Sequence, residues 1–175
     1  DALNWYAKIA MDAKSGLFMT FAFGMNNLFK DVYRNSSASF RLALMEKKTR
    51  AMEKGPERTK EERAIQDLRN MPENLFTIGS LITTNEFDGW VEERLTNLNK
   101  NVRYVHNKFM LVDPLSNDPI VIAGSANFSD ASTTNNDENM LVVRGNTRAA
   151  DIYLGEFMRL YTHHAFRESL GFKGN

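Results

Sequence analysis

Apolar residues recur along the chain with two different spacings, one typical of helices and one typical of strands. Segments whose apolar positions repeat every three or four residues predict amphipathic helices at residues 2–13, 26–35, 59–70, 86–98 and 149–166. Short apolar runs bounded by glycine or polar residues predict strands at residues 17–23, 40–45, 75–82, 102–113, 119–123 and 140–143. Strands that alternate with helices in this order indicate an α/β fold with a mixed central β-sheet and helices on both faces.

Capping residues mark where two of these helices begin. Asn26 or Asn27 is suited to cap the second helix, and residues 59–62 read Thr-Lys-Glu-Glu, a capping box that predicts the start of the third. The dense charges between residues 46 and 70 are typical of a solvated helix face and not of a binding patch. This part of the chain therefore predicts structure more than chemistry.

The length of the chain favours one domain. Its 175 residues suffice for one hydrophobic core, so residues 1–175 are expected to fold together. Because the chain begins at Asp1 and not at a methionine, we interpret it as a piece of a longer polypeptide whose preceding part, with any signal peptide, is missing. The longest apolar runs are far shorter than the ~20 residues that span a bilayer.

Charge and cysteine content narrow the possible chemistry. Lys plus Arg and Asp plus Glu both number 22, so no field of one sign attracts polyanions and any phosphate binding needs a local cluster. The absence of cysteine excludes disulfides and thiolate metal sites but leaves the cellular compartment open. His, Asp and Glu do not cluster at metal-ligand spacing, and Asp130 and Asp137 are better explained as turn residues.

One local cluster lies on the predicted strand over residues 102–113. His106 and Lys108 are two residues apart, so their side chains emerge on one face with Cα atoms roughly 6.6 Å apart. Imidazole is a competent nucleophile at neutral pH, and an ammonium group neutralises phosphoryl oxygens. Taken alone, this pair would be read as an ordinary sheet histidine beside a surface lysine. Asp113 is an odd number of residues from both, so its side chain is expected on the other face of the strand, and it is the last residue of that strand.

Two polar segments that follow predicted strands supply further candidates. Gly124 opens a Gly-Ser-Ala-Asn segment in which a glycine lets backbone amides approach a ligand, and Ser125 and Asn127 offer small, rigid donors. Glu138 precedes the last predicted strand, where its carboxylate can bond a catalytic imidazole and fix its tautomer. Taken alone, residues 135–139 would be read as a polar turn.

In their order along the chain, these motifs resemble the signature of a known superfamily. His106, Lys108 and Asp113, followed by the Gly-Ser-Ala-Asn segment and then Glu138, resemble the histidine-lysine-aspartate signature of the phospholipase D superfamily. The resemblance is specific over residues 102–143, extends to the final helix, and is only architectural over the first hundred residues. The interval between the aspartate and the glycine is longer than in compact members, which we attribute to a lengthened turn between the two strands.

The resemblance implies a phospholipase D-like catalytic half-domain that hydrolyses or transfers a phosphodiester through a phosphohistidine, with no metal and no cofactor. One histidine attacks phosphorus, and a second protonates the leaving alcohol. His106 is expected to be one of the two, and Asp113 to orient and stabilise without reacting. The expected catalytic residues are His106, Lys108, Asp113 and Glu138. The expected phosphate ligands are Lys108, Ser125 and Asn127.

This mechanism requires a second signature, which the chain does not contain. His163 and His164 are the other histidines, neither is followed by lysine at the second position, and both lie on the final predicted helix. The second signature is therefore expected from a homodimer mate or, as we favour, from a preceding domain of the same polypeptide.

The substrate class stays open between a phospholipid and a nucleic acid. The neutral charge balance disfavours a nuclease, which usually presents a basic face, so a phospholipid is the favoured substrate. A lipid enzyme needs exposed apolar residues at the mouth of its cleft, and Phe109 or Phe128 can serve, although buried aromatics are commoner. A non-catalytic scaffold that keeps the fold is the remaining alternative.

Overall fold

The strands of the computed structural model form one mixed sheet. The structure describes residues 1–46, 48, 55–79 and 105–171, and within them six strands lie in the order β3-β2-β1-β4-β5-β6. β1, β2 and β3 are parallel, whereas β4 runs antiparallel to β1 and β5, and β6 antiparallel to β5. The strands are β1 Gly16–Phe21, β2 Phe40–Met45, β3 Asn74–Ile78, β4 Phe109–Val112, β5 Ile120–Gly124 and β6 Met140–Arg144.

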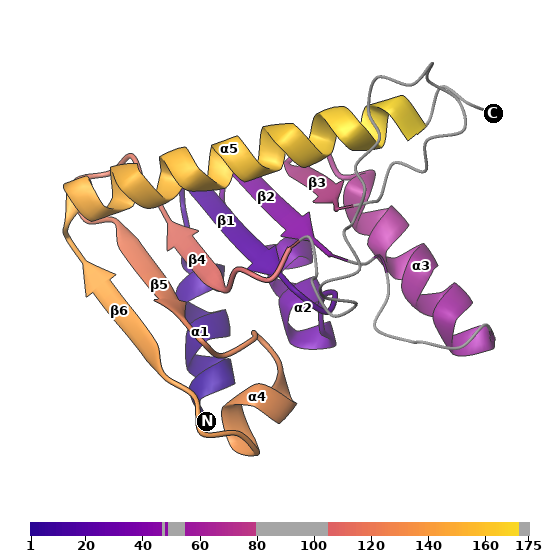
Figure 1. Cartoon of the computed structure of the whole chain (residues 1–175), viewed down its shortest axis with the longest axis horizontal. Coiled ribbons are helices and arrows are strands. Elements are labelled where there is room, and N and C mark those ends of the chain that lie inside the picture. The colour runs from indigo at the N-terminus through magenta and orange to yellow at the C-terminus, as the bar shows by residue number, and fades with distance from the viewer. Residues whose placement is uncertain (47, 49–54, 80–104, 172–175) are drawn as a thin grey trace, which may run out of the picture.

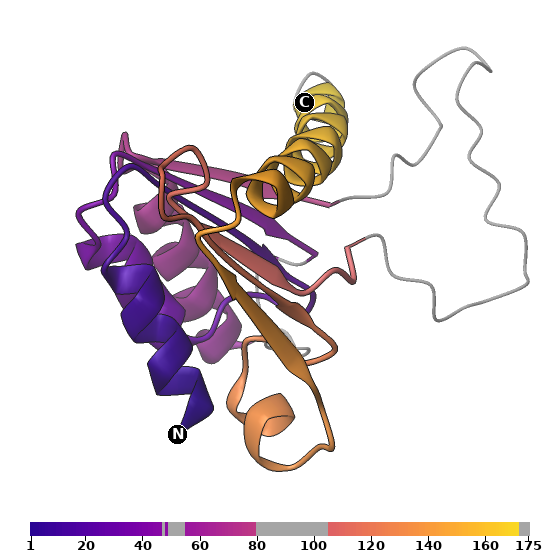
Figure 2. The same ribbon diagram turned by 90° about the vertical axis from the view of Figure 1, so that its left-hand side faces the viewer.

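Helices cover both faces of this sheet, which confirms the predicted fold class (Figures 1 and 2). Three helices lie on one face, and a long helix crosses the other. The three are α1 Ala2–Met11, α2 Asn27–Asn35 and α3 Pro56–Arg69, the long helix is α5 Thr147–Gly171, and a short helix, α4 Asp130–Thr134, follows β5. Among the described residues, no helix combines the length and apolar character needed to cross a membrane.

The sheet has a hydrophobic core on each side. Met19 and Phe21 of β1 pack with the residues of α1 and α2, while Phe18 faces α5 and meets Phe157 edge-on, with ring centroids 5.5 Å apart. Parallel strands covered on both faces read as continuous apolar runs, which is why residues 17–23 lack clear alternation.

The predicted strand over residues 102–113 is shorter in the structure. β4 begins only at Phe109, and residues 105–108 precede the sheet, while residues 102–104 lie outside the described chain. The hydroxyl of Thr20 accepts a hydrogen bond from the Phe109 amide at 3.1 Å and donates one to the Asn107 carbonyl at 2.6 Å. Because a side chain takes these backbone groups, the β1–β4 ladder ends there.

Other predicted boundaries also change. The capping box was wrong, since α3 begins at Pro56 after Gly55, and the hydroxyl of Thr59 instead donates to the Gly55 carbonyl at 3.2 Å. A proline at the first helical position already has the φ that a helix needs. α4 was not predicted, and α5 is longer at both ends than the predicted helix over residues 149–166. The predicted helix over residues 86–98 lies outside the described residues.

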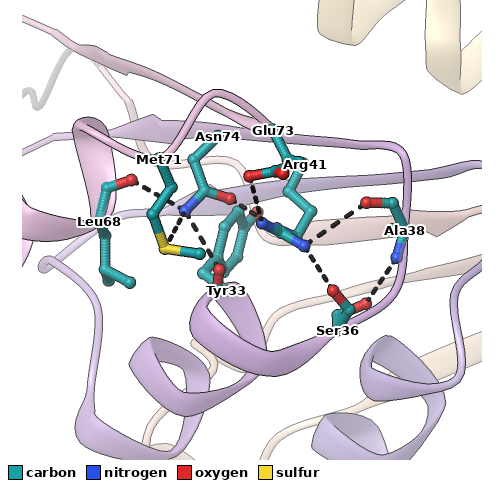
Figure 3. Close-up of polar contacts among 8 residues, drawn as sticks. All are labelled: Tyr33, Ser36, Ala38, Arg41, Leu68, Met71, Glu73 and Asn74. Atoms are coloured by element: carbon teal, nitrogen blue, oxygen red, sulfur yellow. Dashed lines mark hydrogen bonds and ion pairs between the residues drawn. The ribbon is translucent and has the colours of Figure 1, made fainter.

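A buried arginine fastens the helices to the sheet (Figure 3). The guanidinium of Arg41 donates to the carbonyls of Ser36 and Ala38 and, at 2.6 Å, to the side-chain oxygen of Asn74. Asn74 in turn donates to the carbonyls of Tyr33 in α2 and Leu68 in α3 (Figure 3). This network joins the ends of α2 and α3 to the starts of β2 and β3.

The strand directions bring one end of each of the six strands to the same side of the sheet. The carboxyl ends of β1, β2, β3 and β5 and the amino ends of β4 and β6 meet at the lower edge in Figure 1. We call this end of the strands the site edge. The other end of the strands, which we call the opposite edge, holds the start of β1 and the end of β4.

Candidate active site

His106 and Lys108 meet at the site edge, just before β4. The ammonium nitrogen of Lys108 lies 2.8 Å from Nδ1 and 3.1 Å from Nε2 of the His106 ring, and donates to the His106 carbonyl at 2.7 Å. His106 is exposed and Lys108 half-buried. Both groups can therefore contact one phosphate that arrives from solvent.

The surroundings of Lys108 alter its acidity. Burial lowers the pKa of Lys108 below its ordinary value of 10.5, while the carboxylates of Glu138 and Glu46 raise it, and the net shift is downward. A partly dehydrated ammonium gains more from a phosphate oxygen than a fully hydrated one does, because less water must be displaced.

Thr20 fixes the backbone that carries this pair. Its side chain is buried, and its hydroxyl bridges the carbonyl of Asn107 and the amide of Phe109, the residues on either side of Lys108. Sequence reasoning missed Thr20, because nothing in its own segment indicates that its hydroxyl lies beside residues 107–109.

Phe23 is a second residue at the site that sequence reasoning missed. It follows β1 and is 43% exposed, and its ring meets the His106 ring edge-on, with centroids 6.0 Å apart. The same phenylalanine lines a pocket of about 360 Å³, together with residues that follow β5. Phe23 therefore contacts both this pocket and the imidazole.

Ser125 joins the ends of β5 and β6. Its amide donates to the Asn139 carbonyl at 3.0 Å, and its hydroxyl accepts from the Asn139 amide at 3.0 Å. A Cβ on Gly124 would lie 2.1 Å from the Asn139 oxygen, so only glycine fits. The chain that approaches this glycine closely is therefore β6, whereas we expected a ligand.

Asn127 lies in the loop between β5 and α4. Its amide nitrogen donates to the hydroxyl of Ser132 at 3.3 Å, and its amide oxygen is buried with no hydrogen-bond partner in the described part of the chain. α4 thus orients this carboxamide, which lines the same pocket as Phe23.

Asp113 lies at the opposite edge, so β4 separates it from His106. Its carboxylate accepts hydrogen bonds from the amides of Lys14, Ser15 and Gly16 and from the Ser15 hydroxyl, at 2.7 to 3.1 Å. Burial raises the pKa of Asp113, but the hydrogen bonds from Gly16, Ser15 and Lys14 lower it, and the net pKa lies below the ordinary 3.8. Asp113 therefore orients the start of β1 and does not contact the His106–Lys108 pair.

Glu138 lies before β6 at the site edge. Its carboxylate accepts a hydrogen bond from the Asn136 amide at 3.4 Å, and none joins it to His106 in this arrangement. Glu138 acts on the site by electrostatics, since its negative charge raises the pKa of Lys108. The structure therefore brings Glu138 to the site edge as a neighbour of the ammonium.

The two remaining histidines lie on α5. His164 is buried, and its ring lies close to Gly79, which follows β3, while His163 lies 3.3 Å from the Arg167 guanidinium. β2 and β1 separate β3 from β4 in the sheet. Within the described ranges, no group of three or more His, Cys, Asp or Glu side chains gathers as a metal site.

An accessible imidazole and ammonium, together with hydroxyl and carboxamide groups, thus lie at one edge of the mixed sheet of an α/β protein. Residues 78–161 match the family model described as cardiolipin synthase, PLD-like domain. This match covers just under half of the chain and agrees with the resemblance to the phospholipase D superfamily that the sequence predicted.

Solved structures share this fold at low sequence identity. Nuc, a phospholipase D family member from Salmonella typhimurium, is 14% identical with a TM-score of 0.62, over 93% of this chain and 88% of that one. NucT from Helicobacter pylori is 17% identical with a TM-score of 0.56, over 91% and 87%. The polyphosphate kinase of Porphyromonas gingivalis is 13% identical with a TM-score of 0.55, over 93% and 24%. None of the curated protein sequences matches the chain.

Proposed function

We propose that the chain supplies one half of a phosphodiesterase active site, in which His106 and Lys108 act on a phosphate. The observation that carries this proposal is the contact of 2.8 Å between the ammonium and the imidazole at an exposed sheet edge. A neutral imidazole is a nucleophile, and an ammonium neutralises phosphoryl oxygens, so this pair can attack a diester without a metal. The match of residues 78–161 to a PLD-like domain supports the same chemistry.

The reaction proceeds in two steps through a phosphohistidine. An imidazole nitrogen forms a bond to phosphorus while the bond from phosphorus to the leaving oxygen breaks. Water, or another alcohol, then attacks phosphorus, and the bond between phosphorus and nitrogen breaks. Lys108, Ser125 and Asn127 hold the phosphate oxygens, Glu138 supports the charge of Lys108, and Asp113 keeps the far end of β4 in place.

The leaving oxygen needs a proton, which general acid catalysis supplies at a gain of about a hundredfold to ten-thousandfold. His164 is buried and His163 lies beside Arg167, and neither is followed by lysine at the second position, so neither carries a second signature. A second signature therefore supplies the acid, either from a second copy of this chain or from another domain. His106 is then the nucleophile or the acid, according to which half binds the leaving group.

The substrate is a phosphodiester, and the phospholipid that the sequence favoured has limited support at the site. Phe109 and Phe128 are each 4% exposed, so neither offers an apolar surface to a lipid. Phe23 is exposed beside His106 instead. The His106–Lys108 pair itself acts on the phosphate, which lipids and nucleic acids have in common.

Turnover of bis(p-nitrophenyl) phosphate in EDTA tests the proposal. With the second signature present, as a second copy of the chain or as the other domain, we expect nitrophenolate release that EDTA does not suppress, and loss of nearly all of it in His106→Asn. His163→Asn is the matched control, since His163 is an exposed histidine on α5, and it should keep full activity. Acid-labile, alkali-stable phosphate on His106 in quenched samples would identify the intermediate. Substantial turnover by His106→Asn would contradict the proposal.

A further inference from the structure

The pocket beside His106 has a lining that sets it apart from a phosphate site. Its walls come from the segment after β1 and the segment after β5, and they include Phe23, Asn127 and Asn136. The hydroxyls of Ser129 and Ser132 complete its polar lining, and none of the described residues that line it is charged. We call this the Phe23 pocket.

Phe23 links this pocket to the catalytic pair. Its ring lies 6.0 Å from the His106 ring, centre to centre, and the residue also lines the pocket. A diester whose phosphate lies at Lys108 therefore places the group next to its phosphate in the Phe23 pocket. That group must suit an uncharged lining.

The lining disfavours the usual parts of a phospholipid. A choline, ethanolamine or serine headgroup carries charge, which would find no counter-charge in the lining of this pocket. Acyl chains need a continuous apolar surface, yet Phe21, Ala22 and Phe128 are nearly fully buried, and carboxamides and hydroxyls surround Phe23.

A nucleobase matches each of these features. It is an uncharged plane that stacks on an exposed aromatic ring, and its edges bond carboxamides and hydroxyls. The amide oxygen of Asn127 is buried and lacks a hydrogen-bond partner among the described residues, so this carboxamide keeps an unused acceptor close to the pocket. The volume of about 360 Å³ falls in the range of small-ligand pockets.

We propose that the Phe23 pocket binds an unpaired nucleobase next to the scissile phosphate, which makes single-stranded nucleic acid the substrate class. This rests on the proposed phosphodiesterase function. Phe23 provides the stacking surface, and Asn136 bonds the edge of the base. Asn127 accepts from that edge through its amide oxygen, which leaves its amide nitrogen for the phosphate. Because the contact is with one base and not with a basic groove, it is compatible with a chain whose formal net charge is zero.

A pair of labelled oligonucleotides tests this inference in the His106→Asn protein, which binds without turnover. One is oligothymidylate, and the other is an abasic phosphodiester of the same length. We expect tighter binding of the oligothymidylate, by about tenfold, as one base stacked on an aromatic ring contributes. Phe23→Ala should remove most of this ratio, and Phe23→Trp should keep it.

Phe40→Ala is the matched control, because Phe40 is 59% exposed at the start of β2, on the opposite edge of the sheet. It should leave the ratio unchanged. An affinity ratio near one in the parent protein, or displacement of the oligonucleotide by phosphatidylglycerol vesicles but not by unlabelled oligothymidylate, would overturn the inference. A ratio near one with turnover of the nitrophenyl diester would overturn the base pocket and leave the phosphodiesterase function supported. Base preference with no turnover, even when the second signature is present, would refute only the phosphodiesterase function.

Discussion

A single buried hydroxyl holds the backbone that presents the two reactive side chains. Thr20 bonds the backbone on both sides of Lys108, and both bonds come from one oxygen atom. Displacement of a reacting group by about 1 Å can cost about a hundredfold in rate. The position of Lys108 therefore depends on a side chain that never meets the substrate.

Replacing Thr20 by valine keeps the shape of the side chain but removes both hydrogen bonds. We expect kcat on the nitrophenyl diester to fall about ten- to a hundredfold with a smaller change in KM, because the pair is misplaced while the pocket stays. Thr20→Ser retains the hydroxyl and should recover most of kcat. If valine and serine lower kcat equally, or if both track a loss of stability in urea, Thr20 does not position the site.

Glu138 acts on the site through charge, and its replacement should change the pH dependence of turnover. Lys108 must be protonated to neutralise phosphate, so activity falls as pH rises through its pKa, which lies below 10.5. Glu138 raises that pKa, so Glu138→Gln lowers it further and moves the alkaline limb of kcat/KM to lower pH. Asp137→Asn, a neighbouring exposed carboxylate, should leave the limb in place. A shift to higher pH in Glu138→Gln would contradict this role.

The sequence predicts part of the site at this scale and misses the rest. His106 and Lys108 are recognisable because their spacing and order match a signature. Thr20 and Phe23 are not recognisable, because their roles arise only when β1 packs antiparallel to β4, a pairing between segments about ninety residues apart. Asp113 was recognised by its spacing, but only the fold shows that its carboxylate bonds the start of β1.

At the scale of elements, apolar spacing predicts the elements better than their ends. Residues 40–45 form β2 as predicted, because this run is buried on both faces. β4 is shorter than its apolar pattern because a distant threonine ends the ladder. α4 was missed because its five residues, Asp-Ala-Ser-Thr-Thr, show no helical spacing and resemble a polar loop.

The attachment of α2 and α3 to the sheet depends on Arg41. Arg41→Met leaves the carbonyls of Ser36 and Ala38 and the oxygen of Asn74 without this donor, and we expect a loss of about 2–4 kcal/mol in unfolding free energy. Arg144→Met removes an exposed ion pair with Asp118 and should leave the urea midpoint unchanged. Equal destabilisation by the two substitutions would show that the buried network contributes no more to the unfolding free energy than an exposed ion pair does.

At the scale of the whole molecule, the central question is where the second acid comes from. The site edge of the described chain presents one imidazole, that of His106, while His163 and His164 lie on α5. A symmetric dimer would place two copies of the site edge face to face, and a two-signature polypeptide would place another domain there. The two arrangements predict different responses to mixing.

In a symmetric dimer each site needs His106 from both copies, so an equal mixture of parent and His106→Asn chains, once exchanged, should retain about a quarter of the activity. The same protein should sediment as a dimer wherever it is active. If the acid belongs to another domain, this chain alone should be inactive, and addition of that domain should restore turnover without any effect of chain exchange. Half of the activity in the mixture, from a species that sediments as a monomer, would contradict both arrangements, because one histidine would then suffice for attack and for protonation of the leaving group.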